Sequence, residues 1–296
     1  MVVATPSAAD FYDLLAYVPA VSDARTRVAR SIVTLGTAVL LIGDGGATWV
    51  DFDAGTQEEA AAPSGLASFD EVAGGRTIEG PNGETFVVGA TRKQGSTRAV
   101  LGVSDDGSLR AYVGITARSG AAAAWIDGVG LTLAGGSSEG SGIEVLAEGA
   151  SALVAKPFAA DPTEGAAVFR SASGQLTLVG GVASGAAAST RTADLTCVAA
   201  CEAVPIEPSL PVSVRGGVAY AMPDGRVMVI AEADDETAAT RTFLVDLAAG
   251  AVAEHALREP RSGATAVATP NGTLAILGGL HLDGTPARSV ESWFPM

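Results

Sequence analysis

The feature that most restricts the fold of this chain is a short apolar run ending in glycine, which recurs six times at nearly constant spacing. The runs are TAVLLIGDG, TFVVGA, LTLAGG, LTLVGG, RVMVIAE and TLAILGG. Their equivalent positions are Gly43, Gly89, Gly135, Gly180, Ala231 and Gly278. The successive spacings are 46, 46, 45, 51 and 47 residues. Self-similarity at a fixed period of this length indicates a repeat architecture.

A turn glycine lies six or seven residues before each of these equivalent positions and fixes the register of the repeat. Four of these turns are Asn82-Gly83, Asp127-Gly128, Asp224-Gly225 and Asn271-Gly272. Such pairs tolerate the positive φ angles of two-residue hairpin turns. One apolar segment precedes each turn, and two strand-like segments follow each run. Each unit is therefore predicted to be four antiparallel strands, the size of a propeller blade.

The composition supports short strands joined by tight turns rather than long amphipathic helices. The chain of 296 residues contains 37 glycines, is 48% hydrophobic and is only 17% charged. No stretch has a convincing helical period. We therefore predict an all-β fold: a six-bladed β-propeller that forms one domain over residues 1–296. The predicted blades cover approximately residues 24–64, 70–114, 115–155, 156–208, 211–257 and 258–296.

The two ends of the chain suggest how the ring closes. The sixth unit stops directly after its third strand, SVESWF, and residues 11–19 precede the first unit. We expect residues 11–19 to supply the missing fourth strand of the last blade, because closure removes an exposed strand edge. The alternative is that the chain is a fragment of a longer array.

The order of strand, Gly-Gly, variable loop and strand ending in an aromatic residue resembles the kelch repeat. The last copy, PRSGATAVATPNGTLAILGGLHLDGTPARSVESWFP, is the nearest match. The resemblance covers about Ala24 to Met296, although Asp44, Ala90 and Glu232 replace the second glycine in three copies. It implies a kelch-type propeller, and its alanine-rich style is similar to kelch proteins of bacteria. Kelch motifs specify a fold and little chemistry.

The charge of the chain bears on its partners. The net charge is −15, with 33 acidic and 18 basic residues. An acidic surface repels phosphate backbones and anionic membranes, so we expect no nucleic-acid partner. No apolar run approaches the ~20 residues of a membrane span, so no membrane insertion is predicted. We expect a monomer whose partner is a protein or an anionic glycan.

Cys197 and Cys201 are the only cysteines, and they lie in the segment TCVAAC. Their three-residue spacer is longer than that of a redox C-x-x-C motif, and no histidine is near enough in sequence to complete a zinc site. A disulfide is the favoured interpretation, and two free thiols are the alternative. Because disulfides persist in oxidising compartments, we expect an extracytoplasmic protein: periplasmic, secreted or an outer-membrane lipoprotein whose leader is absent from this sequence.

Arginines recur just before the first strand of most units. They are Arg27, Arg76, Arg118, Arg215 and Arg261, and Lys156 is the nearest counterpart in the fourth unit. In a propeller these positions lie at one mouth of the central channel. There they would form a cationic site for a carboxylate or sulfate. The alternative is that each arginine belongs to the repeat itself and pairs with nearby carboxylates.

No nucleophile, base or metal constellation is evident in the sequence. His255 and His281 are the only histidines, and two histidines without further ligands do not make a metal site. We therefore predict a non-catalytic binding module without a metal or a cofactor and assign no catalytic residue. The alternative is a small-sugar enzyme of the sialic acid epimerase or lyase type, which would use the arginine-lined channel mouth.

Overall fold

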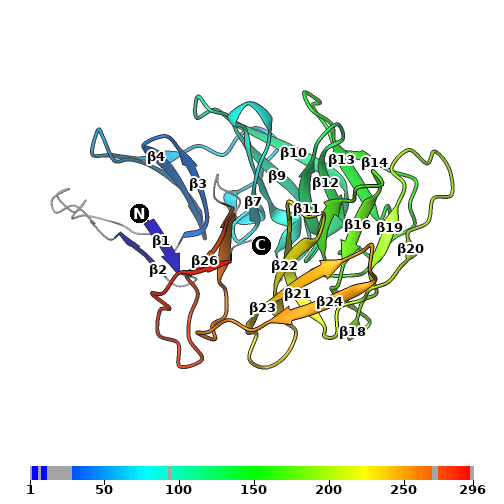
Figure 1. Ribbon diagram of the computed structural model, residues 1–296. Helices are drawn as coiled ribbons and strands as arrows, with labels where there is room; N and C mark the ends of the chain where they lie inside the picture. The colour runs from blue at the N-terminus through cyan, green and yellow to red at the C-terminus, as the bar shows by residue number, and fades with distance from the viewer. Residues whose placement is uncertain (1, 6–7, 12–28, 93–94, 269–272, 294–296) are drawn as a thin grey trace.

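The computed structural model contains six antiparallel β-sheets that follow one another around a common axis (Figure 1). The structure describes residues 2–5, 8–11, 29–92, 95–268 and 273–293. Five of the sheets have four strands, and the sixth has three within the described residues. In Figure 1 the chain passes once round the ring from blue to red. The chain is a six-bladed β-propeller.

The first strand of each blade lies nearest the axis: those of blades 1 to 5 contact one another in succession, and Tyr220 of the fifth is hydrogen-bonded to Ala266 of the sixth. These strands are β3 (Ala29–Leu35), β7 (Arg76–Glu79), β11 (Ala122–Ile126), β15 (Ala167–Arg170), β21 (Val214–Ala221) and β25 (Thr265–Ala268). The second strands are β4 (Ala38–Gly43), β8 (Thr85–Val88), β12 (Gly130–Ala134), β16 (Leu176–Val179), β22 (Val227–Ala233) and β26 (Leu274–Leu277).

The third strands are β5 (Gly46–Asp51), β9 (Thr97–Val103), β13 (Ile143–Leu146), β19 (Arg191–Ala193), β23 (Thr240–Asp246) and β27 (Glu291–Trp293). The fourth strands are β6 (Thr56–Ala60), β10 (Leu109–Arg118), β14 (Val154–Ala155), β20 (Val204–Pro205) and β24 (Ala251–His255). The described helices are three short 3-10 turns, η1 (Phe69–Glu71), η2 (Pro81–Gly83) and η3 (Gly89–Thr91). Within the described residues no helix is long and apolar enough to cross a membrane.

Both repeat signals in the sequence have the structural role predicted for them. Each apolar run forms the second strand of its blade. The preceding turn glycines that the structure describes all have positive φ, from +56° at Gly36 to +86° at Gly225. Glycine adopts this conformation without the steric cost that a Cβ atom brings. The sixth turn, at Asn271-Gly272, lies outside the described residues.

The hydrophobic core is divided into layers between successive blades. Leu40 of β4 and Leu101 of β9 belong to one layer, between blades 1 and 2. Leu131 of β12 and Phe86 of β8 belong to the next layer, between blades 2 and 3. Similar layers lie between the later blades. No blade can bury both of its apolar faces alone, so the ring stabilises all of them together.

The fourth blade explains why one repeat is longer than the others. A small hairpin, β17 (Val182–Ala183) and β18 (Ala186–Ala187), is inserted between its second and third strands. The disulfide loop lies between its third and fourth strands. Both insertions lie outside the shared four-stranded sheet, so the blade keeps its strand order.

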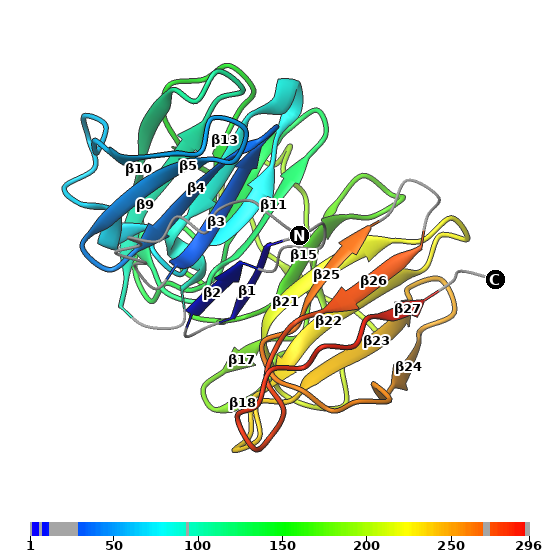
Figure 2. The same cartoon turned by 90° about the vertical axis from the view of Figure 1, so that its left-hand side faces the viewer.

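The first described residues form a hairpin of their own, β1 (Val2–Thr5) and β2 (Ala8–Phe11). In both views it lies between blade 1 and blade 6, where the ring must close (Figures 1 and 2). Of the predicted closing strand at residues 11–19, only Phe11 is described, and it ends β2. Residues 12–19 lie outside the described residues, so this closing strand stays a prediction.

Candidate functional site

Arg118 lies at the end of β10 and is fully buried, with its side chain inside blade 3. Its Nε is 3.2 Å from a carboxylate oxygen of Glu144, whose side chain is also fully buried. Its Nη1 donates to the carbonyl oxygens of Gly135 and Gly142, at 2.7 and 3.2 Å. Its Nη2 donates to the carbonyl oxygen of Ser141 at 2.6 Å. Burial lowers the pKa of Arg118, although attraction to Glu144 opposes this shift.

Arg261 has the same role in blade 6. It is fully buried, and its Nη2 is 3.0 Å from Glu291 of β27 and 3.1 Å from Glu259. Its Nη1 donates to the carbonyl oxygen of Ser289 at 2.8 Å. Arg118 binds a glutamate of the third strand of blade 3, and Arg261 binds a glutamate of the third strand of blade 6. Both guanidinium groups are therefore bonded to groups inside the blades and do not face the channel.

Arg215, near the start of β21, is partly exposed and is held between two carboxylates. Its Nη1 donates to Glu164 at 2.5 Å, and its Nε donates to Asp234. The hydrogen bond to Asp234, followed by the one to Glu164, raises the pKa of Arg215, although burial opposes the shift. Arg27 lies outside the described residues.

Arg76, the first residue of β7, has a different environment. Its Nη1 donates to the carbonyl oxygen of Gly217 at 2.8 Å, which joins blade 2 to blade 5 on the opposite side of the six-bladed ring. No carboxylate among the described residues lies within ion-pair distance of its guanidinium. Burial lowers the pKa of Arg76 to about 10, while attraction to Tyr220 opposes the shift. Arg76 is therefore a cation at the centre of the ring without a compensating charge in the described part of the chain.

Three glycines place the carbonyl group that Arg76 binds. The N–H of Gly165 donates to the oxygen of Gly120 at 2.6 Å, and the N–H of Gly217 donates to the oxygen of Gly165 at 2.9 Å. This axial glycine chain links blades 3, 4 and 5. A Cβ atom on Gly165 would lie 2.5 Å from the Cα atom of Arg215, so the approach requires glycine.

A small hollow adjoins this centre between the inner strands of blades 5 and 6. It has a volume of about 90 Å³, and Gly216, Tyr220, Thr240 and Ala266 are among the residues that line it. The hydroxyl of Tyr220 donates to the carbonyl oxygen of Ala266 at 2.7 Å. Burial raises the pKa of Tyr220, against the opposing effect of Arg76. The hollow holds about three waters, or a few heavy atoms of a ligand.

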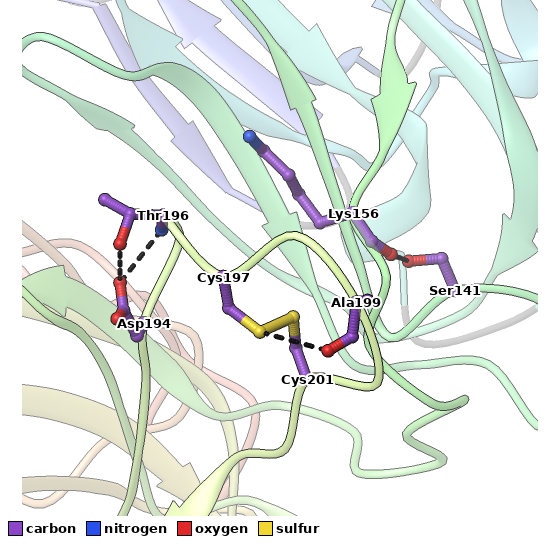
Figure 3. The surroundings of a disulfide bond; sticks show 7 residues. All are labelled: Ser141, Lys156, Asp194, Thr196, Cys197, Ala199 and Cys201. Carbon is purple, nitrogen blue, oxygen red and sulfur yellow. Dashed lines mark hydrogen bonds between the residues drawn. A yellow bond between two sulfur atoms is a disulfide. The ribbon is translucent and has the colours of Figure 1, made fainter.

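The predicted disulfide between Cys197 and Cys201 is confirmed, in the loop between β19 and β20 (Figure 3). Cys201 is buried, and its N–H donates to the carbonyl oxygen of Pro157 at 3.0 Å. The carbonyl oxygen of the adjacent Lys156 accepts a bond from Ser141 Oγ at 2.6 Å (Figure 3). The disulfide loop is thereby fixed to the segment that joins blades 3 and 4.

The histidines have partners that do not make a metal site. His281 Nε2 lies 2.9 Å from Glu259, and the ring of His255 meets that of Trp293 edge-on at 6.3 Å. Across the described residues no group of three or more His, Cys, Asp or Glu side chains is arranged to hold a metal ion.

Sequence reasoning identified Arg76 but missed Tyr220 and Gly217. The available signal was the pair Gly216-Gly217 inside an apolar strand pattern, which is typical of a β-bulge. The pairing of β21 with β22 does shift register between Arg215 and Val218. The contact across the ring depends on two segments 141 residues apart, so periodicity could not reveal it.

Comparison with known proteins supports the fold. The chain is similar in structure to YjhT, with a TM-score of 0.56 at 14% identity over 89% of this chain and 96% of that one. It is also similar to a streptogramin B lyase, with a TM-score of 0.50 at 12% identity over 90% and 82% of the two chains. No protein-family model and no curated protein matches the sequence. At these identities the likeness extends to the propeller fold alone.

Proposed function

We propose that this propeller is a non-catalytic binding protein of the kelch type, which takes a small carboxylate ligand at Arg76. The supporting observation is that, within the described residues, Arg76 has no carboxylate partner like those of Arg118, Arg215 and Arg261. A partly buried cation with no counter-charge among the described residues favours an anion that supplies one. A carboxylate matches the planar donor face of a guanidinium group.

The adjoining hollow supports a small ligand. Tyr220 interacts electrostatically with Arg76 and also lines the hollow between β21 and β25. A carboxylate paired with Arg76 could therefore place a few further atoms beside Tyr220. An acidic sugar, such as a sialic or uronic acid, carries a carboxylate next to hydroxyl groups that hydrogen-bond to such polar surroundings.

The alternative, an epimerase or lyase acting on a small sugar, would require several arginines together with a buried acid or base. In the described part of the channel the structure brings together one arginine, Arg76, and one tyrosine, Tyr220, and the carboxylate that also lines the hollow, Glu232, is partly exposed. The hydroxyl of Tyr220 already donates a hydrogen bond to the carbonyl oxygen of Ala266. These observations favour binding over turnover.

We further propose that the protein is exported and acts as a monomer. The disulfide between Cys197 and Cys201 supports export, because such bonds persist in oxidising compartments.

Calorimetric titration with N-acetylneuraminate and with glucuronate tests the proposed function. We expect Arg76→Met to weaken binding about tenfold or more, because a charge-assisted pair is lost. Arg215→Met is the matched control, since its guanidinium is already paired with Glu164 and Asp234; it should leave the affinity within about threefold. Equal binding by Arg76→Met, or no binding of either acid by the wild-type protein at millimolar concentration, would overturn the proposal.

The same titration has an expected pH profile. Arg76 binds an anion only while it is protonated, and its pKa is about 10 in the ligand-free protein. The affinity should therefore be level through neutral pH and fall as the pH rises through about 10. A fall that begins below pH 8 would show that another group governs binding.

A further inference from the structure

A second and larger hollow lies between blades 2 and 3, at the end of β7 away from Arg76. Its volume is about 370 Å³. Its walls come from the β7–β8 and β9–β10 turns, from β8, β10 and β11, and from the residues that follow β13. We call it the blade 2–3 cleft. This cleft shares no lining residue with the hollow beside Arg76, so binding in it does not depend on the proposed carboxylate site.

Aromatic rings from three strands line the cleft. They are Phe86 of β8, Tyr112 of β10 and Trp125 of β11. The rings of Phe86 and Trp125 are stacked, with centroids 5.9 Å apart and planes 5° from parallel. The rings of Phe86 and Tyr112 are 6.1 Å apart and tilted. Trp125 is partly exposed, whereas the other two are buried, so the cleft has a rigid aromatic wall.

The charged residues around this wall are mainly acidic. Glu84, Asp105 and Glu148 line the cleft, against the single cation Arg110. The hydroxyl of Tyr112 donates to Glu84 at 3.1 Å, which orients that carboxylate. Gly102 leaves room for this pair, because a Cβ atom there would lie 2.8 Å from the Tyr112 ring and 2.9 Å from the Glu84 carboxylate.

The cleft already accommodates a cation on one of its rings. The guanidinium carbon of Arg110 lies 5.9 Å from the centroid of the Tyr112 ring, within the range of a cation–π interaction. Arg110 is exposed, so a ligand could displace it at little cost in packing. Aromatic faces combined with carboxylates are the surroundings that recognise organic cations in proteins.

We propose that the blade 2–3 cleft binds an organic cation, an alkylammonium or guanidinium group, in place of the Arg110 side chain. The negative charge of the whole chain raises the local concentration of such a ligand. Such a cationic group occurs both in small alkylammonium molecules and in the basic side chains of peptides. The test therefore uses one probe of each kind.

Fluorescence titration with choline and with the peptide acetyl-Gly-Arg-Gly-amide tests the proposal, since Trp125 reports occupancy. We expect choline, the peptide or both to bind at millimolar concentration. Arg110→Ala should tighten binding about three- to tenfold, because it removes a competing like charge. Asp105→Asn should weaken binding by a similar factor. Tighter binding of choline than of the peptide indicates a small-molecule alkylammonium ligand, and the reverse indicates a protein partner.

Arg170→Ala is the matched control, because Arg170 is an exposed arginine on blade 4 and should leave the affinity unchanged. Both substituted cleft positions, Arg110 and Asp105, are exposed, so we expect these variants to fold. Weaker cation binding by Arg110→Ala would overturn the proposal. So would equal binding of glucose or glucuronate, or no response to either cationic probe.

Discussion

Replacing Arg118 with methionine is expected to lower the free energy of unfolding by about 3–5 kcal/mol. The substitution leaves the buried carboxylate of Glu144 without its cation, and it removes the donors bound by the carbonyl groups of Gly135, Gly142 and Ser141. An uncompensated buried charge is costly because the protein interior does not solvate it as water does. Urea denaturation followed by tryptophan fluorescence measures the loss.

The matched control is Arg226→Met, which breaks an ion pair with Asp224 at the surface. Both side chains of that pair are about one-third exposed. Solvent-exposed pairs contribute little to stability, so the control should remain close to the wild-type protein. The double variant Arg118→Met, Glu144→Gln should recover part of the stability, since it removes the orphaned charge. Equal losses for Arg118→Met and Arg226→Met would contradict the structural role assigned to Arg118.

Gly165→Ala is expected to destabilise the ring more than the same change at an open turn. Gly165 has φ +75°, and its added Cβ atom would lie 2.5 Å from the Cα atom of Arg215. Gly185, in the β17–β18 turn, has φ +77° and open space around its Cβ position. In both variants the left-handed conformation of the alanine lowers the free energy of unfolding by about 1–2 kcal/mol. Only Gly165→Ala must also separate two blades, at a further cost of roughly 1–3 kcal/mol.

The difference in stability between these two variants measures the effect of the close contact between blades 4 and 5 alone. Thermal unfolding of both proteins and of the wild type gives the comparison directly. The melting temperature should fall further for Gly165→Ala than for Gly185→Ala. Similar melting temperatures for the two variants would show that the axial glycine chain is less tightly packed than the structure indicates.

The fold could be predicted from the sequence because each repeat carries local signals. Positive-φ glycines such as Gly83 and Gly225 mark the turns, and apolar runs mark the second strands. These signals act over a few residues, and six copies reinforce one another. The disulfide was predictable for a similar reason, since Cys197 and Cys201 are close in sequence.

The functional sites could be predicted only in part. Sequence reasoning placed Arg76, Arg118 and Arg261 near the start of the first strand of their units, and it could not tell which arginine has no carboxylate partner among the described residues. That difference depends on side chains distant in sequence, such as Glu144 beside Arg118 and Gly217 beside Arg76. The blade 2–3 cleft was missed because its rings come from three strands of two blades.

Folding is not expected to require the charge of Arg76, which is therefore available to a ligand. Urea denaturation of Arg76→Met without any added anion tests this claim most directly. We expect a free energy of unfolding equal to or higher than that of the wild type, because the substitution removes a partly buried charge that has no counter-charge among the described residues. A loss of about 2 kcal/mol or more would contradict it, because the guanidinium would then be paired within the protein itself.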